Sequence, residues 1–175
     1  MSVSTGEEAL QDAFRAAMAA VCTPVSVVTT LEGGLPYGTT VSAFTSLSLD
    51  PPMILVSLDR NSDLLAKVHR TGRFGLNVLA SSQPELAMNF ARKGGTAKFS
   101  GVRWREAGGV PLLPGVASFL ACEVERHVDG GDHVVILGNV VYIETADGRP
   151  LTYHARAFGT HTVLASEAPK HGRPN

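Results

Sequence analysis

The sequence has no marked excess of charge of either sign and no long apolar run. Its 175 residues carry 15 basic and 16 acidic side chains, for a net charge of −1. Binding to nucleic acid phosphates usually needs a basic surface, so this balance argues against nucleic acid as the main partner. No apolar run is long enough to span a bilayer. The N-terminus lacks the basic region and apolar core of a signal peptide. We therefore expect a cytoplasmic protein with no membrane association.

Cysteine is scarce as well, and the familiar catalytic signatures are missing. The two cysteines, Cys22 and Cys122, form no CxxC pair and have apolar neighbours in the sequence, which predicts two reduced, buried thiols. The chain contains no P-loop, no GxGxxG after a strand, no HExxH and no GxSxG. Its six histidines show no spacing that is typical of a metal site, so we expect none.

What the chain does have is the composition of one globular domain. Hydrophobic residues make up 44% and charged residues 18%, which is typical of a folded protein with a sizeable core. We expect the domain to span residues 9–165, between flexible tails of residues 1–8 and 166–175. About seven strands, joined mostly by hairpin turns, and three short helices predict a mainly β fold: an antiparallel barrel with a few peripheral helices.

The most informative stretch is GTTVSAFTSLSLDPP, which runs from Gly38 to Pro52. It is predicted to be one strand that ends at Asp50-Pro51-Pro52, because proline cannot donate to a sheet hydrogen bond. Alternate positions form a face of small hydroxyls, broken only by Phe44: Thr40, Ser42, Ser46 and Ser48. Such a face suits a flat polar ligand that lies close to the backbone. A solvated strand face rich in serine and threonine is an equally good interpretation.

Weaker signals elsewhere also favour a binding site. Asn61-Ser62 begins a predicted helix, where the dipole and free N–H groups favour a phosphate, although a plain N-cap is the simpler interpretation. Lys98 follows a glycine pair and could reach a phosphate, or could merely be solvated. His133 is the first residue of a predicted buried strand, and Tyr153-His154 lies in the predicted strand that follows Pro150. These side chains could border a cleft and hold a planar ring, or could be structural.

In their order along the chain, these segments resemble the flavin reductase-like family, the reductase components of two-component flavin-dependent monooxygenases. The resemblance covers roughly residues 14–161 and rests on four segments: TPVSVVTT, GTTVSAFTSLSLDPPMILVSL, Gly131-Asp132-His133 with its ILGNV strand, and PLTYHARAFG. It implies an antiparallel split β-barrel of the FMN-binding type, with Greek-key connections, and a homodimer. It also implies that NADH or NADPH reduces FMN or FAD by hydride transfer, and that the reduced flavin leaves for a separate monooxygenase.

The resemblance further implies roles for particular residues. His133 would lie near the nicotinamide and orient it, without carrying the reaction itself, because the cofactor does the difficult chemistry. The remaining implied residues surround the flavin: Gly38, Thr39, Thr40, Val41 and Ser42 at the ring edge, Ser46 and Ser48 at the ribityl chain and phosphate, Asn61 and Ser62 at the phosphate, Lys98 and Phe99 near the flavin, and Tyr153 and His154 at the nicotinamide or flavin edge. Arg60-Asn61-Ser62 departs from the commoner family pattern, which weakens the phosphate assignments.

Three other functions stay open. A flavin carrier or storage protein would share the barrel but would not need the Gly131-Asp132-His133 triplet or Tyr153-His154. A pyridoxamine-phosphate-oxidase-like enzyme would need a cluster of Arg and Lys along the strands, which the sequence lacks. A non-enzymatic dimeric barrel would have no evident use for a hydroxyl-lined strand. The sequence does not distinguish FMN from FAD, or NADH from NADPH.

Overall fold

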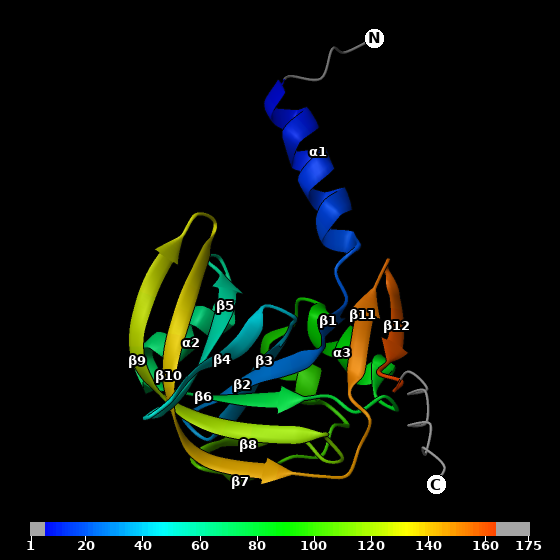
Figure 1. Ribbon diagram of the computed structural model, residues 1–175. Coiled ribbons are helices and arrows are strands. Elements are labelled where there is room, and N and C mark those ends of the chain that lie inside the picture. The colour runs from blue at the N-terminus through cyan, green and yellow to red at the C-terminus, as the bar shows by residue number, and fades with distance from the viewer. Residues whose placement is uncertain (1–5, 164–175) are drawn as a thin grey trace, which may run out of the picture.

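The structure is a computed structural model that describes residues 6–163. Most of it is a seven-stranded antiparallel sheet. The strand order is β3-β2-β6-β9-β10-β5-β4 (Figure 1). Its strands are β2 (Ser26–Glu32), β3 (Leu35–Val41), β4 (Phe44–Leu49), β5 (Pro52–Asp59), β6 (Arg73–Val78), β9 (Ser118–Gly130) and β10 (His133–Thr145). The predicted mainly β, antiparallel architecture is therefore confirmed.

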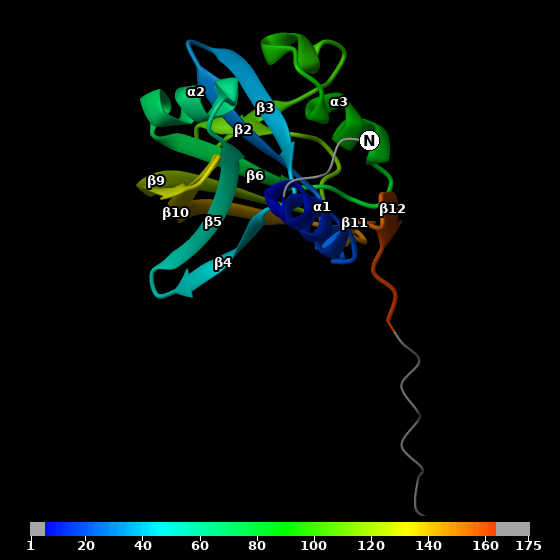
Figure 2. The ribbon, with the colours of Figure 1, turned by 90° about the horizontal axis from the view of Figure 1, so that it is seen from above.

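Two small sheets and a few helices complete the fold. One small sheet has the order β1-β11-β12 and the other pairs β7 with β8. Their strands are β1 (Thr23–Pro24), β11 (Leu151–His154), β12 (Ala157–Thr160), β7 (Arg105–Ala107) and β8 (Val110–Leu112). The helices are α1 (Gly6–Ala19), α2 (Asp63–Thr71), α3 (Pro84–Ala91) and a 3₁₀ helix, η1 (Gly95–Phe99). Seen from above, α2 and α3 lie on either side of β3 (Figure 2).

The predicted tails fall largely outside the described part of the chain. Residues 1–5 and 166–175 lie outside the described residues, whereas residues 6–8 begin α1. Among residues 6–163, no helix is both long enough and apolar enough to cross a membrane.

The predicted single strand from Gly38 to Pro52 is wrong, because the chain changes partner in the middle of it. β3 pairs with β2, whereas β4 pairs with β5. Ser42 and Ala43 separate β3 from β4, and the N–H of Ser57 in β5 donates to the Ala43 carbonyl at 2.9 Å. β3 and β4 are the two edge strands of the sheet. Since only two residues join them, the sheet is curled, and its edges approach each other at this corner.

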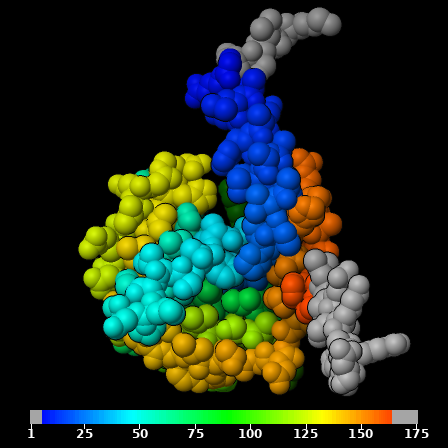
Figure 3. All heavy atoms as spheres, in the orientation of Figure 1, coloured from blue at the N-terminus to red at the C-terminus, as the bar shows by residue number. Residues whose placement is uncertain are grey.

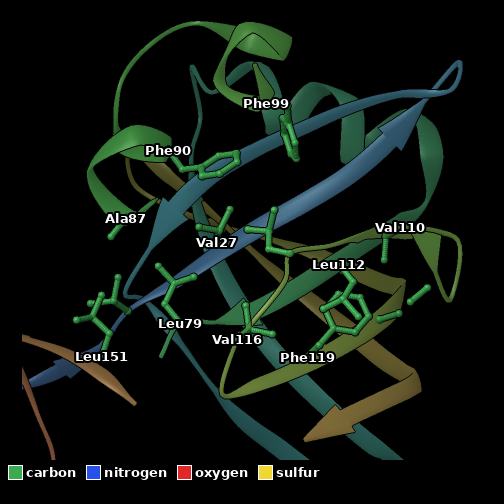
Figure 4. Packing of buried hydrophobic residues seen from close by; sticks show 14 residues of the cluster. Val27, Leu79, Ala87, Phe90, Phe99, Val110, Leu112, Val116, Phe119 and Leu151 are labelled. Atoms are coloured by element: carbon green, nitrogen blue, oxygen red, sulfur yellow. The ribbon is translucent and has the colours of Figure 1, made fainter. Parts of the chain in front are cut away.

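Both faces of the central strands are buried, because successive side chains of a strand point to opposite faces. Val27 belongs to one buried cluster and its neighbour Val28 to another. The first, the α3-side cluster, includes residues of α3, η1 and the central strands: Val27, Leu79, Ala87, Phe90, Phe99 and Phe119 (Figure 4). The second, the α2-side cluster, lies beneath α2: Val28, Val56, Leu58, Leu65, Val68, Phe74 and Ile136. The helices that flank β3 are thus anchored independently of each other.

Helix α1 is the exception to this burial, because none of its residues is buried. Its apolar side chains Leu10, Phe14 and Met18 recur at helical spacing and are 70%, 63% and 48% exposed. Figures 1 and 3 show the helix projecting from the rest of the molecule. Cys22, in the link between α1 and β1, is exposed, so the prediction of two buried thiols is wrong for this residue. Cys122 in β9 is buried, and burial raises the pKa of its thiol to about 12.

Candidate active site

A polar cleft of about 690 Å³ opens at the corner where the sheet edges approach each other. β3 and the loop after α3 border it on one side, and the end of β5, the start of α2 and the start of β10 border it on the other. The predicted site residues that line it are Gly38, Thr39, Thr40, Val41, Ser42, Asn61, Ser62, Lys98 and His133. Segments far apart in the sequence therefore meet in one cleft.

The hydroxyls of β3 are used within the fold. The Thr40 hydroxyl donates to the Ala87 carbonyl of α3 at 2.6 Å, and the Thr39 hydroxyl donates to the Phe90 carbonyl at 3.5 Å. A threonine hydroxyl has one proton to donate, so in these contacts its oxygen remains only as an acceptor for a ligand. This wall therefore offers a ligand backbone groups and acceptor oxygens, rather than the row of free hydroxyls that the sequence predicts.

Lys98, in the 3₁₀ helix η1 that follows α3, closes the same wall. Its ammonium group donates to the carbonyls of Gly38 at 3.1 Å and Phe90 at 3.0 Å. An ammonium has three N–H donors, so these two bonds leave a third for a ligand. Burial lowers the pKa of the Lys98 ammonium, and the nearby negative charge of Asp63 opposes this shift. Lys98 is thus a partly desolvated cation held at a fixed position against β3.

Glycines allow α3 and η1 to lie close against β3. A Cβ on Gly38 would lie 3.1 Å from Cε1 of Phe90 and 3.2 Å from the Val28 carbonyl oxygen. Gly94 and Gly95 have φ values of 155° and 51°, which side chains rarely permit. The turn that they form leads the chain from α3 into η1, where Lys98 meets β3.

Two further cations line this side of the cleft and were not singled out from the sequence. Arg92 and Lys93 precede the glycine pair and are exposed in the cleft lining. The signal was present in the sequence, as the run Arg92-Lys93-Gly94-Gly95 ahead of Lys98. Together the three cations favour an anionic ligand group on this side.

The start of α2 forms part of the opposite wall. Ser62 is the N-cap, and its hydroxyl accepts a hydrogen bond from the Leu64 N–H at 3.2 Å. The N–H of Asn61 donates to the Asp59 carboxylate at 2.6 Å, and Asp63 adds a negative charge to the first turn. The plain N-cap interpretation therefore describes Ser62 in this structure. The cations of the facing loop are better placed to attract an anion than this helix start is.

His133 stands at the first position of β10, directly after the turn from β9. Its Nδ1 contacts the Asp132 carboxylate at 2.8 Å, and this hydrogen bond and the histidine charge lower the pKa of the Asp132 carboxyl. In the sheet, His133 pairs with Asp59 of β5. The half-buried imidazole therefore lines the cleft beside the β5–α2 connection, while Asp132 engages one of its two ring nitrogens.

The other predicted residues do not line this cleft. Ser46 and Ser48 lie on β4, beyond the corner. Phe99 is buried and packs edge-to-face on Phe90 (Figure 4). Tyr153 and His154 are exposed on β11, in the small sheet next to the base of α1 (Figure 1).

Tyr37 is a lining residue that the sequence analysis missed. It precedes Gly38 on β3, and the Lys67 ammonium of α2 lies 4.1 Å from its ring centroid. An aromatic ring held over a cation is a stable contact. Its place beside Gly38 on the same strand was the available signal.

The fold and the cleft define a class: a mainly β protein with an open polar cleft. The cleft is lined by strand backbone and by the segment after α3 that carries Arg92, Lys93 and Lys98, here called the cationic loop. Such a cleft fits a planar ligand with an anionic arm. The chain matches the family model described as "Flavin reductase like domain" over residues 18–162, and it belongs to that family.

Relatives and solved structures agree with this assignment. The chain is 35% identical to the "NADH-dependent flavin reductase" of a Rhodococcus species, over 89% of each chain. It is 36% identical to the "Flavin-dependent monooxygenase, reductase subunit HsaB" of Rhodococcus jostii, over 81% of this chain and 73% of that one. It also resembles the solved structure of the Streptomyces globisporus "NADH:FAD oxidoreductase SgcE6 in complex with NAD and FAD fragments", with a TM-score of 0.81 and 26% identity, over 98% of this chain and 100% of that chain.

Proposed function

We propose that the protein is an NAD(P)H:flavin oxidoreductase, which reduces FMN or FAD by hydride transfer and supplies the reduced flavin to a separate flavin-dependent monooxygenase. The observation that carries this proposal is the meeting of the β3 wall, the cationic loop and His133 in one cleft. Membership of the family and the names of the relatives support the activity.

In this proposal, one group of residues binds the flavin and His133 binds the nicotinamide. Gly38–Ser42 border the flavin ring edge, and Lys98, together with Arg92 and Lys93, attracts the flavin phosphate. Asn61 and Ser62 border the phosphate from the opposite wall. His133 orients the nicotinamide. The flavin supplies a ring that accepts a hydride, so the chain itself contributes alignment, proximity and charge rather than a nucleophile.

The predicted site residues that lie outside the cleft do not contact a ligand bound within it. Phe99 supports Lys98 from within the α3-side cluster. Ser46 and Ser48, and likewise Tyr153 and His154, reach the reactants only if the ligand extends past the corner or if a second copy of the chain brings them near. Residues 9–165 form the proposed functional domain.

The first experiment measures oxidation of NADH and of NADPH by the purified protein, with no flavin or with added FMN, FAD or riboflavin. Oxidation that requires a flavin and saturates with its concentration is the expected result. If flavin binds, as judged by quenching of its fluorescence, and yet no nicotinamide is oxidised in any combination, the reductase proposal fails and a flavin carrier is the better description.

A homodimer and a closed fold belong to the same proposal. The exposed apolar side chains of α1 need a partner surface, because an isolated helix of this length is only marginally stable in water. We take a second copy to be that partner, and the curled sheet to be one side of a split barrel with Greek-key connections. Light scattering is expected to give twice the chain mass, and Phe14→Glu is expected to favour monomers. A monomeric wild type would refute the dimer.

The setting in which the protein acts follows from its reactants. Reduced nicotinamide and free flavin are soluble metabolites, so we propose a cytoplasmic protein whose partners are these two molecules, a separate monooxygenase and a second copy of itself. Nucleic acid and membranes have no part in the proposal. Fractionation of cells that express a tagged chain is expected to recover it with the soluble cytoplasmic enzymes, and recovery with membranes would contradict this.

A further inference from the structure

Arg60 connects the two segments that form the wall opposite β3. It lies between the end of β5 and Asn61, two residues before Ser62, the N-cap of α2. Its backbone N–H donates to the Asp132 carbonyl at 2.9 Å, its side-chain Nε donates to the Gly131 carbonyl at 3.0 Å, and its Nη2 donates to the Asp129 carboxylate at 2.9 Å. All three acceptors belong to the turn region between β9 and β10.

This turn places His133 in the cleft. β9 ends at Gly130 and β10 begins at His133, so the connection consists of Gly131 and Asp132 alone. Gly131 has a φ of 70°, and the Asp132 carboxylate contacts Nδ1 of the imidazole at 2.8 Å. Whatever fixes these two residues also fixes where the imidazole lies and which of its nitrogens is engaged.

The contacts of Arg60 require a guanidinium group. Two N–H groups of one planar fork reach two acceptors, a carbonyl and a carboxylate, at the same time. A lysine ammonium is a single point of charge on a flexible chain, so it holds such a pair of acceptors less firmly. Since the side chain is 44% exposed, its ion pair contributes little to overall stability. Its effect should therefore show in the geometry of the turn rather than in folding.

We infer that Arg60 is a positioning residue, which fixes the Gly131-Asp132 turn, and with it His133, against the start of α2. Arg60 thereby sets the affinity for the reduced nicotinamide without touching either reactant. This inference rests on the proposed function in its assignment of His133 to the nicotinamide.

The test compares Arg60→Ala, Arg60→Lys and Asp129→Ala with the wild type. Arg60→Ala is expected to raise the KM for NADH by about 3- to 10-fold, while the flavin dissociation constant changes by less than about twofold. Arg60→Lys should fall between Arg60→Ala and the wild type. The double variant Arg60→Ala/Asp129→Ala should be no worse than Arg60→Ala, because both changes remove the same contact.

Arg73→Ala is the matched control. Arg73 forms an ion pair with Glu123 at 2.6 Å, is 48% exposed and does not line the cleft. It should leave both the KM for NADH and the flavin affinity unchanged. The inference is overturned if Arg60→Ala leaves the KM for NADH unchanged, if flavin affinity falls in parallel, or if Arg73→Ala has the same effect.

A second readout does not depend on activity. The NMR signals of the His133 ring in the free protein are expected to shift in Arg60→Ala and to stay in place in Arg73→Ala. Unchanged His133 signals in Arg60→Ala would refute the positioning role even if the wild type is an active reductase. If the wild type oxidises no NADH but the signals shift, the positioning role holds and the proposed function is what fails.

Discussion

The two walls of the cleft are built from different kinds of contact. On the β3 side, half-buried side chains donate to main-chain carbonyls: Thr40 to Ala87 of α3, and Lys98 to Gly38 and Phe90. On the opposite side, the exposed ion pair of Arg60 with Asp129 joins the β5–α2 connection to the β9–β10 turn, and within that turn the Asp132 carboxylate contacts the His133 ring.

The difference implies different rigidity. A hydrogen bond shielded from water is costly to break, because a buried group is left unpaired. An exposed ion pair competes with water and salt, so it contributes little and opens readily. We therefore expect the β3 wall to be a fixed platform for the flavin, and the His133 wall to adjust as the nicotinamide arrives and departs.

The largest expected effect lies on the fixed wall. Lys98→Met removes the half-buried cation and should weaken FMN binding by about 10- to 100-fold, the loss of one charge-assisted hydrogen bond. Riboflavin, which has no phosphate, should lose less than about threefold. Titration of flavin fluorescence measures both. Equal losses for the two ligands would mean that Lys98 mainly holds η1 against β3 and does not bind the phosphate.

A smaller effect is expected on the adjustable wall. His133→Ala should lower turnover and raise the KM for NADH by about 5- to 10-fold, because the imidazole orients the nicotinamide and does not carry the hydride. Flavin should still bind. Steady-state kinetics with each substrate varied in turn gives the two constants. Loss of flavin binding in this variant would overturn the division of roles between the walls.

His154→Ala is the matched histidine variant for this comparison, since His154 is exposed on β11 and lies outside the cleft. Unchanged kinetics would confine the nicotinamide site to the cleft of one chain. An effect as large as that of His133→Ala would show that the site extends beyond it.

The smallest expected effect is on the free energy of unfolding, and it tests whether the β3 wall is more rigid than the His133 wall. Thr40→Val keeps the shape of the side chain but leaves the Ala87 carbonyl without its donor, and should lower the free energy of unfolding by about 1 kcal/mol. Thr40→Ser, which retains the hydroxyl, should lose less. Arg60→Ala should change this free energy by less than about 0.5 kcal/mol. Urea denaturation measures all three, and equal losses for Thr40→Val and Arg60→Ala would remove the distinction between the walls.

Much of the fold could be predicted, because local patterns determine it. The hairpin turn before His133 and the helix that begins after Ser62 both follow from glycine, asparagine and serine chemistry that acts over a few residues. The break at Ser42–Ala43 could not be predicted. Alternation of side chains describes a strand but not its partner, and here the partner changes from β2 to β5.

The candidate site could be predicted as positions but not as contacts. Gly38, Thr40, Lys98 and His133 all line the cleft. That the Thr40 hydroxyl donates to Ala87 depends on how α3 packs over β3, which is set by residues far away in the sequence. Whether Cys22 is covered depends in the same way on the position of α1, and apolar neighbours in the sequence carry no information about it.

The aromatic chain behind Lys98 has an optical consequence. Trp104 is the only tryptophan of the protein, and its ring lies 6.4 Å from that of Phe99, which in turn meets Phe90 at 4.8 Å. Phe99 directly follows the residue whose ammonium lines the cleft. Tryptophan fluorescence therefore comes from one position, which packs against the residue that follows Lys98, and the unlabelled protein can report each arrival and departure of a light-absorbing ligand in real time.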